Sequence, residues 1–145
     1  MLLQILNTKV IFNAQKTEGG NAKGYLSFDR VDINIGDAFN GSSGIFNVPV
    51  SGIYKLNFSG QSAYERNDVT RVKVYKNGSY ILGIWDSNEG KHEMETTHDG
   101  NNVSYTWIMK LVKGDQLKLE SVNYLYADDV DDFLTFSGEL IHIEN

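Results

Sequence analysis

The chain has no cysteine and a single proline among its 145 residues. The absence of cysteine excludes a disulfide framework, thiolate metal ligands and a cysteine nucleophile. Long apolar runs are also missing, because the segment 1–6 (MLLQIL) is short, is interrupted by Gln4 and lacks a basic lead-in. A membrane-spanning helix needs about 20 apolar residues and a secretory signal peptide begins with positive charge, so we expect neither in this chain.

Positive charge is scarce as well. The chain carries 13 Lys and Arg against 19 Asp and Glu, which gives a formal net charge of −6 at pH 7. Proteins that bind nucleic acid or anionic membranes neutralise phosphates with clustered cations, so this balance argues against both partners and fits metal ions or cationic partners better. Neither a Gly-x-Ser-x-Gly elbow nor a Gly-rich phosphate loop occurs, and we therefore expect a protein that is not an enzyme.

Aromatic residues and glycine are plentiful by contrast, with eight Tyr, seven Phe and 14 Gly. Apolar residues alternate with polar ones in many short runs between turn residues, a pattern typical of half-buried β-strands. The stretches Thr17–Gly24 and Tyr124–Phe133 indicate loops. About nine or ten strands at this spacing predict an all-β sandwich or barrel. The clearest runs are Leu26/Phe28, Val31/Ile33/Ile35, Phe46/Val48/Val50, Tyr54/Leu56/Phe58, Val72/Val74, Val103/Tyr105/Trp107/Met109/Leu111, Leu117/Leu119 and Leu134/Phe136/Gly138/Leu140.

An ordered series of motifs runs through these segments. It comprises Phe12, Phe28, Asn34, Gly36, Phe39, Gly44, Phe46, Pro49, Gly52, Tyr54 and Phe58, then the hairpin signal Lys76-Asn77-Gly78, the turn Gly114-Asp115 and the late Phe136-Ser137-Gly138. In these residues, from Thr8 to Ile143, the chain resembles the globular domain of the complement C1q family, part of the superfamily that includes tumour necrosis factor. Phe39 and Glu139 depart from the family pattern, which would alter the surface beside the last strand.

The resemblance implies a jelly-roll sandwich of about ten antiparallel strands. Residues 1–7 would be a short N-terminal lead and residues 8–145 one C1q-like globular domain. It also implies a homotrimer that is secreted and serves extracellular recognition in innate immunity, with lectin-like binding of glycans, microbial surfaces or protein partners. The alternative is a receptor ligand or a trimerising structural head of a longer secreted protein. Candidates for the core or the seam between subunits are Tyr54, Phe58, Tyr105, Trp107 and Phe136.

Two acidic segments are candidate Ca²⁺ sites. Several members of the family bind Ca²⁺ near the trimer apex, and the matching loop here contains Asp99 and Asn101, with Glu93 and Glu95 before them. The second candidate is the run from Asp128 to Asp132, in which Asp129 and Asp131 would be ligands, because Ca²⁺ prefers several oxygen ligands on a flexible loop. The alternative for both segments is solvated loop charge.

Two further patterns invite a function. His92 and His98 are six residues apart in a polar loop, whereas the zinc-protease motif needs two histidines four apart on a helix, so we reject a zinc site there. Several aromatic residues lie in or near expected loops and outer faces, where aromatic rings can stack on sugars or anchor protein interfaces. Burial in the core or at the seam is the favoured alternative for these residues, which are Tyr64, Tyr75, Tyr80, Trp85, Tyr124 and Tyr126.

Overall fold

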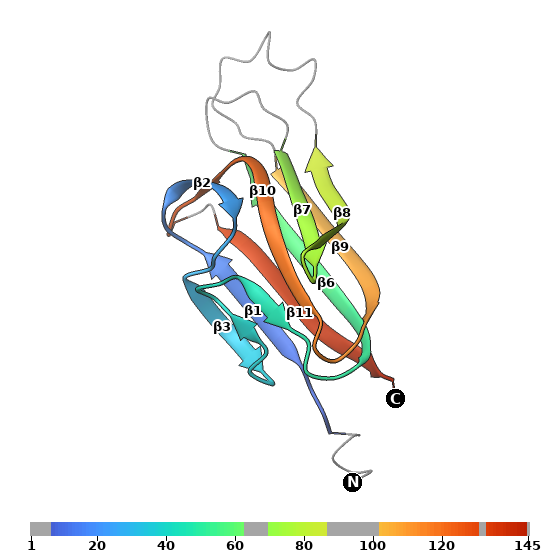
Figure 1. The fold of residues 1–145 in the computed structure, drawn as a ribbon. Coiled ribbons are helices and arrows are strands. Elements are labelled where there is room, and N and C mark those ends of the chain that lie inside the picture. The colour runs from blue at the N-terminus through green and yellow to red at the C-terminus, as the bar shows by residue number, and fades with distance from the viewer. Residues whose placement is uncertain (1–6, 63–69, 87–101, 131–132, 145) are drawn as a thin grey trace, which may run out of the picture.

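The computed structural model describes residues 7–62, 70–86, 102–130 and 133–144 (Figure 1). These residues form eleven β-strands and no helix, so the described part of the chain contains no helix that could cross a membrane. The strands are β1 (Ile11–Lys16), β2 (Gly20–Tyr25), β3 (Arg30–Ile35), β4 (Phe39–Asn40), β5 (Ile45–Asn47), β6 (Gly52–Gln61), β7 (Thr70–Lys76), β8 (Ser79–Asp86), β9 (Asn102–Leu111), β10 (Gln116–Ala127) and β11 (Leu134–Ile143).

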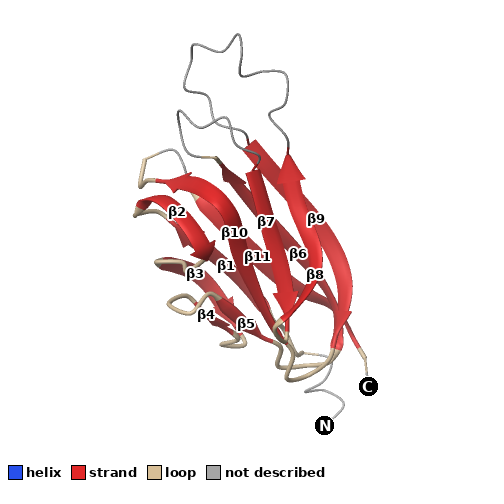
Figure 2. Cartoon of the chain, turned by 45° about the horizontal axis from the view of Figure 1, so that its top comes forward, coloured by secondary structure: helices blue, strands red, loops and turns tan. Residues whose placement is uncertain are grey.

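The strands form two sheets that pack face to face, as Figure 2 shows. The five-stranded sheet has the order β3-β1-β11-β6-β9, and the six-stranded sheet has the order β4-β5-β10-β7-β8 with β2 paired to β10. All the recorded strand pairs are antiparallel. The expected all-β sandwich of antiparallel strands is therefore confirmed.

The core fills the space between the two sheets. Alternate residues of each strand point inward, so the alternation in the sequence marks the buried face. The ring of Phe12 stacks on Phe39 with centroids 4.6 Å apart, and the edge of Phe136 meets Phe12 at 5.1 Å. The side chains buried most completely are Phe12, Leu26, Phe46, Tyr54, Leu56, Phe58, Leu111, Leu117, Leu119, Leu125, Leu134 and Phe136.

The polar and glycine motifs serve the geometry of turns and close approaches. Asn34 closes the turn after β3, because its Oδ1 accepts hydrogen bonds from the backbone N–H groups of Ala38 and Phe39, both at 3.2 Å, and its Nδ2 donates to the carbonyl of Phe39 at 2.9 Å. Gly138 lies directly beneath the ring of Phe12, and a Cβ there would be 2.6 Å from the ring. These motifs therefore specify local backbone and packing geometry.

Three expectations from the sequence need correction. The stretch Thr17–Gly24, expected as a loop, contains most of β2, and β10 continues through Tyr124 to Ala127, where a loop was expected to begin. The run Val31/Ile33/Ile35 does not share one face, because the register between β1 and β3 shifts after Asn13. Val31 packs against the core, whereas Ile33 and Ile35 are exposed on the outer side. A β-bulge of this kind reverses which side chains point inward.

Candidate binding surfaces

The outer face of the five-stranded sheet is the first candidate surface. Strand pairing aligns Ile35, Ile11, Glu139, Lys55 and Ile108 in one row across all five strands. These side chains point away from the core, because Phe12, Gly138 and Leu56, their neighbours along the strands, point inward and are buried. The parallel row beside it consists of Ile33, Asn13, Ser137, Asn57 and Thr106.

This outer face is more apolar than a solvated sheet face requires. The solvent side of an antiparallel sheet is normally polar, yet Ile33, Ile35 and Ile108 are exposed on it, and Ile108 is 62% exposed. A groove of about 310 Å³ runs along the middle of the face between Ile11, Ile33, Asn57 and Ser137 and their neighbours. Large exposed apolar residues gathered on one face mark an interaction surface.

One polar atom at this groove lacks a partner. The Oδ1 atom of Asn13, which lines the groove, is buried and has no hydrogen-bond partner among the described residues. A buried polar atom without a partner costs free energy, about 1–3 kcal/mol. Because the atom has almost no accessible surface, a group from outside reaches it only if the Asn13 side chain turns toward the groove.

The aromatic residues expected at the core or seam divide into two groups. Tyr54, Phe58 and Phe136 are fully buried, as expected for core residues. Trp107 is buried, but Tyr105 is 47% exposed and stacks on Trp107 with centroids 5.8 Å apart. Both rings lie on the inner side of β9, which is the edge strand of its sheet, so Tyr105 reaches past the rim of the core.

The outer face of the six-stranded sheet is the second candidate surface, and the sequence analysis misjudged it. Trp85 and Tyr80, for which burial was favoured, are 62% and 51% exposed. Tyr25, which the sequence analysis did not single out, is 57% exposed on the same face. The alternation of Val72 and Val74 with their neighbours could have indicated that Tyr75 points outward, since those valines point inward. Tyr64 lies outside the described residues.

A buried carboxylate fastens the turn between β9 and β10 to the hairpin between β7 and β8. Asp115 accepts hydrogen bonds from the side-chain amide of Asn77 and from the backbone N–H of Val112, each at 2.9 Å. Asn77 and Gly78 both have positive φ, 53° and 83°, as the tight Asn-Gly hairpin requires. Burial raises the pKa of the Asp115 carboxyl, but the hydrogen bonds from Asn77 and Val112 outweigh it, so the pKa is lowered from its ordinary value.

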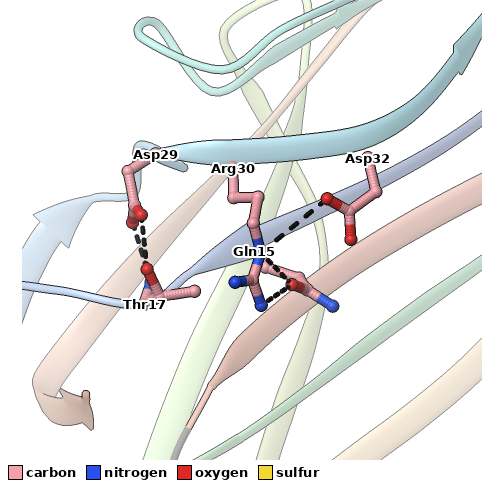
Figure 3. Close-up of polar contacts among 5 residues, drawn as sticks. All are labelled: Gln15, Thr17, Asp29, Arg30 and Asp32. Carbon is pink, nitrogen blue, oxygen red and sulfur yellow. Dashed lines mark hydrogen bonds and ion pairs between the residues drawn. The ribbon is translucent and has the colours of Figure 1, made fainter. Parts of the chain in front are cut away.

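A second carboxylate fastens the end of β1 to the start of β3 (Figure 3). Asp29 accepts hydrogen bonds from the backbone N–H of Thr17 at 2.7 Å and from its hydroxyl at 2.5 Å. Beside it, the Arg30 guanidinium donates to Gln15 and lies 3.7 Å from the carboxylate of Asp32. Desolvation raises the pKa of Asp29, but the hydrogen bonds from Thr17 prevail and the pKa is lowered.

These two carboxylates predict an acid-sensitive fold. A lowered pKa in the folded state stabilises the protein above the ordinary aspartate pKa of about 3.9, and that stabilisation is lost as the pH falls through the folded value. We expect the free energy of unfolding, measured by urea titration, to stay level near neutrality and to fall as the pH drops below about 4. Asp115→Asn should be less stable at pH 7 and lose less on acidification. Equal pH dependence of the parent and the variant would contradict this role of Asp115.

The candidate Ca²⁺ ligands lie mostly outside the described residues. Glu93, Glu95, Asp99 and Asn101 belong to the segment 87–101, and Asp131 to the segment 131–132. Asp129 is exposed in the turn after β10, beside a hollow lined by residues 17–20 and 126–129. In the part of the chain that the structure describes, no three His, Cys, Asp or Glu side chains are grouped as metal ligands. Ca²⁺ binding by either segment stays a prediction.

Two relatives from the mouse resemble this chain in sequence. Complement C1q tumor necrosis factor-related protein 3 of Mus musculus is 31% identical over 128 residues, covering 86% of this chain and 48% of that protein. The related protein 6 of Mus musculus is 29% identical over 138 residues, covering 90% of this chain and 48% of that protein. The chain spans about half the length of these relatives.

Solved structures show the same fold. The globular domain of zebrafish complement 1qA superposes with a TM-score of 0.72 at 19% identity, over 93% of this chain and 99% of that chain. Murine APRIL at pH 5.0 gives a TM-score of 0.63 at 13% identity, over 90% of this chain and 98% of that chain. The sandwich is thus a jelly roll of the C1q and tumour necrosis factor type. Since the family model of the C1q domain matches residues 10–141, the chain belongs to the C1q domain family.

Proposed function

We propose that this chain is a non-catalytic, extracellular recognition module that works as a homotrimer. The observation that carries the proposal is the outer face of the five-stranded sheet, where exposed isoleucines surround a groove lined by Asn13. Domains of the C1q and tumour necrosis factor type typically form trimers. A closed trimer would bury this face on every subunit and leave no adhesive surface exposed.

The chemistry of the face suits contact with further copies of the same chain. Ile33 and Ile108 lie on opposite sides of a centre formed by the small polar side chains of Asn13, Asn57 and Ser137. Full burial of an isoleucine from water contributes about 1.5–3 kcal/mol, and Ile33 and Ile108, which are 42% and 62% exposed, would gain part of that. Small polar groups at the centre allow close approach, and a turn of the Asn13 side chain toward the groove would let a partner subunit provide the hydrogen bond that its Oδ1 lacks. Apolar burial thus favours association, and the polar centre gives it specificity.

Two observations support the recognition role: the kind of relatives that match this chain, and the sheet face that a trimer would leave accessible. The relatives that match are C1q tumor necrosis factor-related proteins, so we place this chain outside the cell and assign it binding rather than catalysis. In such a trimer the outer face of the six-stranded sheet, on the opposite side of the sandwich, stays accessible to ligands. Ligand binding would then depend on that face and on the loops at the ends of the sandwich.

A charge placed on the proposed interface tests the trimer. Ile108→Glu is expected to convert the trimer to a monomer in sedimentation velocity at micromolar concentration, because a carboxylate from each subunit would enter a contact formed by isoleucines, with only Lys55 beside it on the sheet. Trp85→Glu is the matched control, since Trp85 is also 62% exposed but lies on the opposite sheet. It should sediment as the parent does. A trimer that tolerates Ile108→Glu, or a Trp85→Glu variant that dissociates, would contradict the assignment of the interface.

A further inference from the structure

An aromatic surface with positive charge lies on the outer face of the six-stranded sheet. Strand pairing places Tyr25 of β2, Tyr75 of β7 and Tyr80 of β8 on the side opposite to the buried Val74 and Leu119. Tyr75 stands between the other two rings, with centroids 5.9 Å from Tyr25 and 6.3 Å from Tyr80, edge to face in both cases. The three tyrosines thus form one continuous ring surface across four strands, which we call the tyrosine face.

Two lysines lie against these rings. The ammonium of Lys118 is 4.3 Å from the ring centroid of Tyr25, and that of Lys73 is 5.7 Å from the ring centroid of Tyr80. Neither ammonium is within ion-pair distance of a carboxylate among the residues that the structure describes. Cation–π contact orients an ammonium but leaves N–H groups able to donate to an anion. On the tyrosine face each of these ammonium groups therefore lies over a ring and keeps N–H groups that can bind an anion.

The rings are held in place before any ligand arrives. The hydroxyl of Tyr75 donates a hydrogen bond to Glu120 at 3.0 Å, and this bond raises the pKa of Tyr75. Tyr80 lies across Gly83, where a Cβ would be only 2.8 Å from the Tyr80 hydroxyl, so glycine is what allows this ring position. Rings fixed on strands lose little conformational entropy on binding. The arrangement suits a binding surface better than an incidental cluster.

The charge on this face differs from that of the whole chain. The chain carries a net charge of −6, but among the described residues of the tyrosine face Lys73, Lys118 and the nearby Arg71 outnumber the carboxylate of Glu120, which lies across from Lys73 and accepts the Tyr75 hydroxyl. A local cationic patch attracts anions at short range even on an acidic protein, since charges beyond about 10 Å are screened at 0.1 M salt. The complementary ligand is therefore anionic.

We propose that the tyrosine face binds an acidic glycan, with its carboxylates bound by Lys73 and Lys118 where their ammonium groups lie over Tyr80 and Tyr25, and its sugar rings packed beside them against the exposed parts of the tyrosine rings. Lysine is depleted at the centre of protein–protein interfaces, which disfavours a protein ligand on a face that has lysines among its rings. A nucleic acid carries dense phosphate charge, which the acidic remainder of the chain would repel. An acidic polysaccharide offers both carboxylates, which the lysines can bind, and sugar faces, which pack against aromatic rings.

This inference rests on the proposed function, because it names the ligand class of the recognition module. The experiment below tests the ligand class and the trimer separately. Titration calorimetry of the full chain with hyaluronan oligosaccharides should show binding that weakens with NaCl, whereas neutral chitin oligosaccharides and a single-stranded oligonucleotide should bind at least about tenfold more weakly. Sedimentation of the same samples reports the oligomer. A trimer that binds no acidic oligosaccharide overturns this inference alone, and a monomer that binds it overturns only the trimer.

Variants locate the binding on the face. Lys73→Ala with Lys118→Ala should weaken binding by roughly tenfold, because two exposed ion pairs are lost. Tyr80→Ala should weaken it by a similar factor, roughly tenfold, through loss of a ring platform. Lys113→Ala, an exposed lysine in the turn between β9 and β10, is the control and should bind as the parent does. Unchanged affinity in the lysine and tyrosine variants, with parent-like melting temperatures, overturns the inference, as does equal binding of neutral and acidic oligosaccharides.

Discussion

Phe136→Ala is expected to lower the free energy of unfolding by about 3–5 kcal/mol, because it removes a fully buried ring and leaves a cavity. The ring of Phe136 contacts three others, with centroids 5.1 Å from Phe12, 5.8 Å from Phe39 and 6.1 Å from Phe28. These rings come from strands of both sheets and from the turn before β3. Loss of Phe136 therefore weakens the contact that joins the two sheets.

Urea titration at pH 7 measures this effect, and Trp85→Ala is its control. Trp85 is the larger side chain but is 62% exposed, so its removal should change the free energy of unfolding by no more than about 0.5 kcal/mol. If Phe136→Ala unfolds at the same urea concentration as the parent, the aromatic cluster does not hold the sandwich together and the packing assigned to β11 is wrong.

Gly44→Ala is expected to be the most damaging single-methyl change in the described part of the chain. Gly44 has a φ of 71°, and a Cβ there would lie 1.9 Å from the carbonyl oxygen of Leu26. That carbonyl belongs to backbone that cannot move freely, because the N–H of Leu26 is bonded to Leu119 at 3.0 Å. An alanine in the left-handed conformation costs roughly 1–2 kcal/mol. The overlap of its Cβ with the Leu26 carbonyl oxygen adds roughly 1–3 kcal/mol more.

Gly78→Ala separates the two costs. Gly78 also has a positive φ, 83°, but an added Cβ would meet nothing within 4 Å. Both variants carry the left-handed strain, and only Gly44→Ala carries the overlap with Leu26. Thermal melts should therefore show a clearly lower melting temperature for Gly44→Ala than for Gly78→Ala. Equal melting temperatures would mean that the turn at Gly44 opens at no cost, which contradicts the close approach to Leu26.

The sequence predicted the strands that bury one face and missed those that do not. Period-two alternation identified β6 and β9 because every second side chain points toward the core side of the sheet, although Tyr105 of β9 stays half-exposed there. The strand β2 has the sequence GNAKGY, which contains two glycines and no alternation, and it forms because β10 pairs with it. The hydrophobic pattern of a segment does not indicate a strand that forms only through its neighbour. Pairing with β10 therefore determines that β2 is a strand.

Alternation also leaves open which side of a strand faces the core. Ile33 and Ile35 alternate as core residues do, but the bulge opposite Asn13 turns them outward while Val31 faces inward. The register shift arises in the pairing of β1 with β3. The sequence of one strand alone does not show it. The outer-face isoleucines, and with them the proposed interface, therefore required the structure.

The second surface was visible in the sequence only in part. For Tyr75, Tyr80 and Trp85 the sequence allowed either an exposed or a buried position, and burial was the favoured interpretation. Their neighbours Lys73, Lys118 and Tyr25 come from three different strands, and strand pairing brings them together. A cluster assembled across strands has no spacing signature along the chain.

Sedimentation equilibrium of the unmodified chain tests the central claim most directly. The account predicts a single species of three times 16.3 kDa at micromolar concentration, with the outer face of the five-stranded sheet buried at its centre. Because Ile108 would lie in the buried interface, Ile108→Glu should dissociate the trimer and shift the mass to 16.3 kDa. An unmodified chain that sediments as a stable 16.3 kDa monomer would contradict the account.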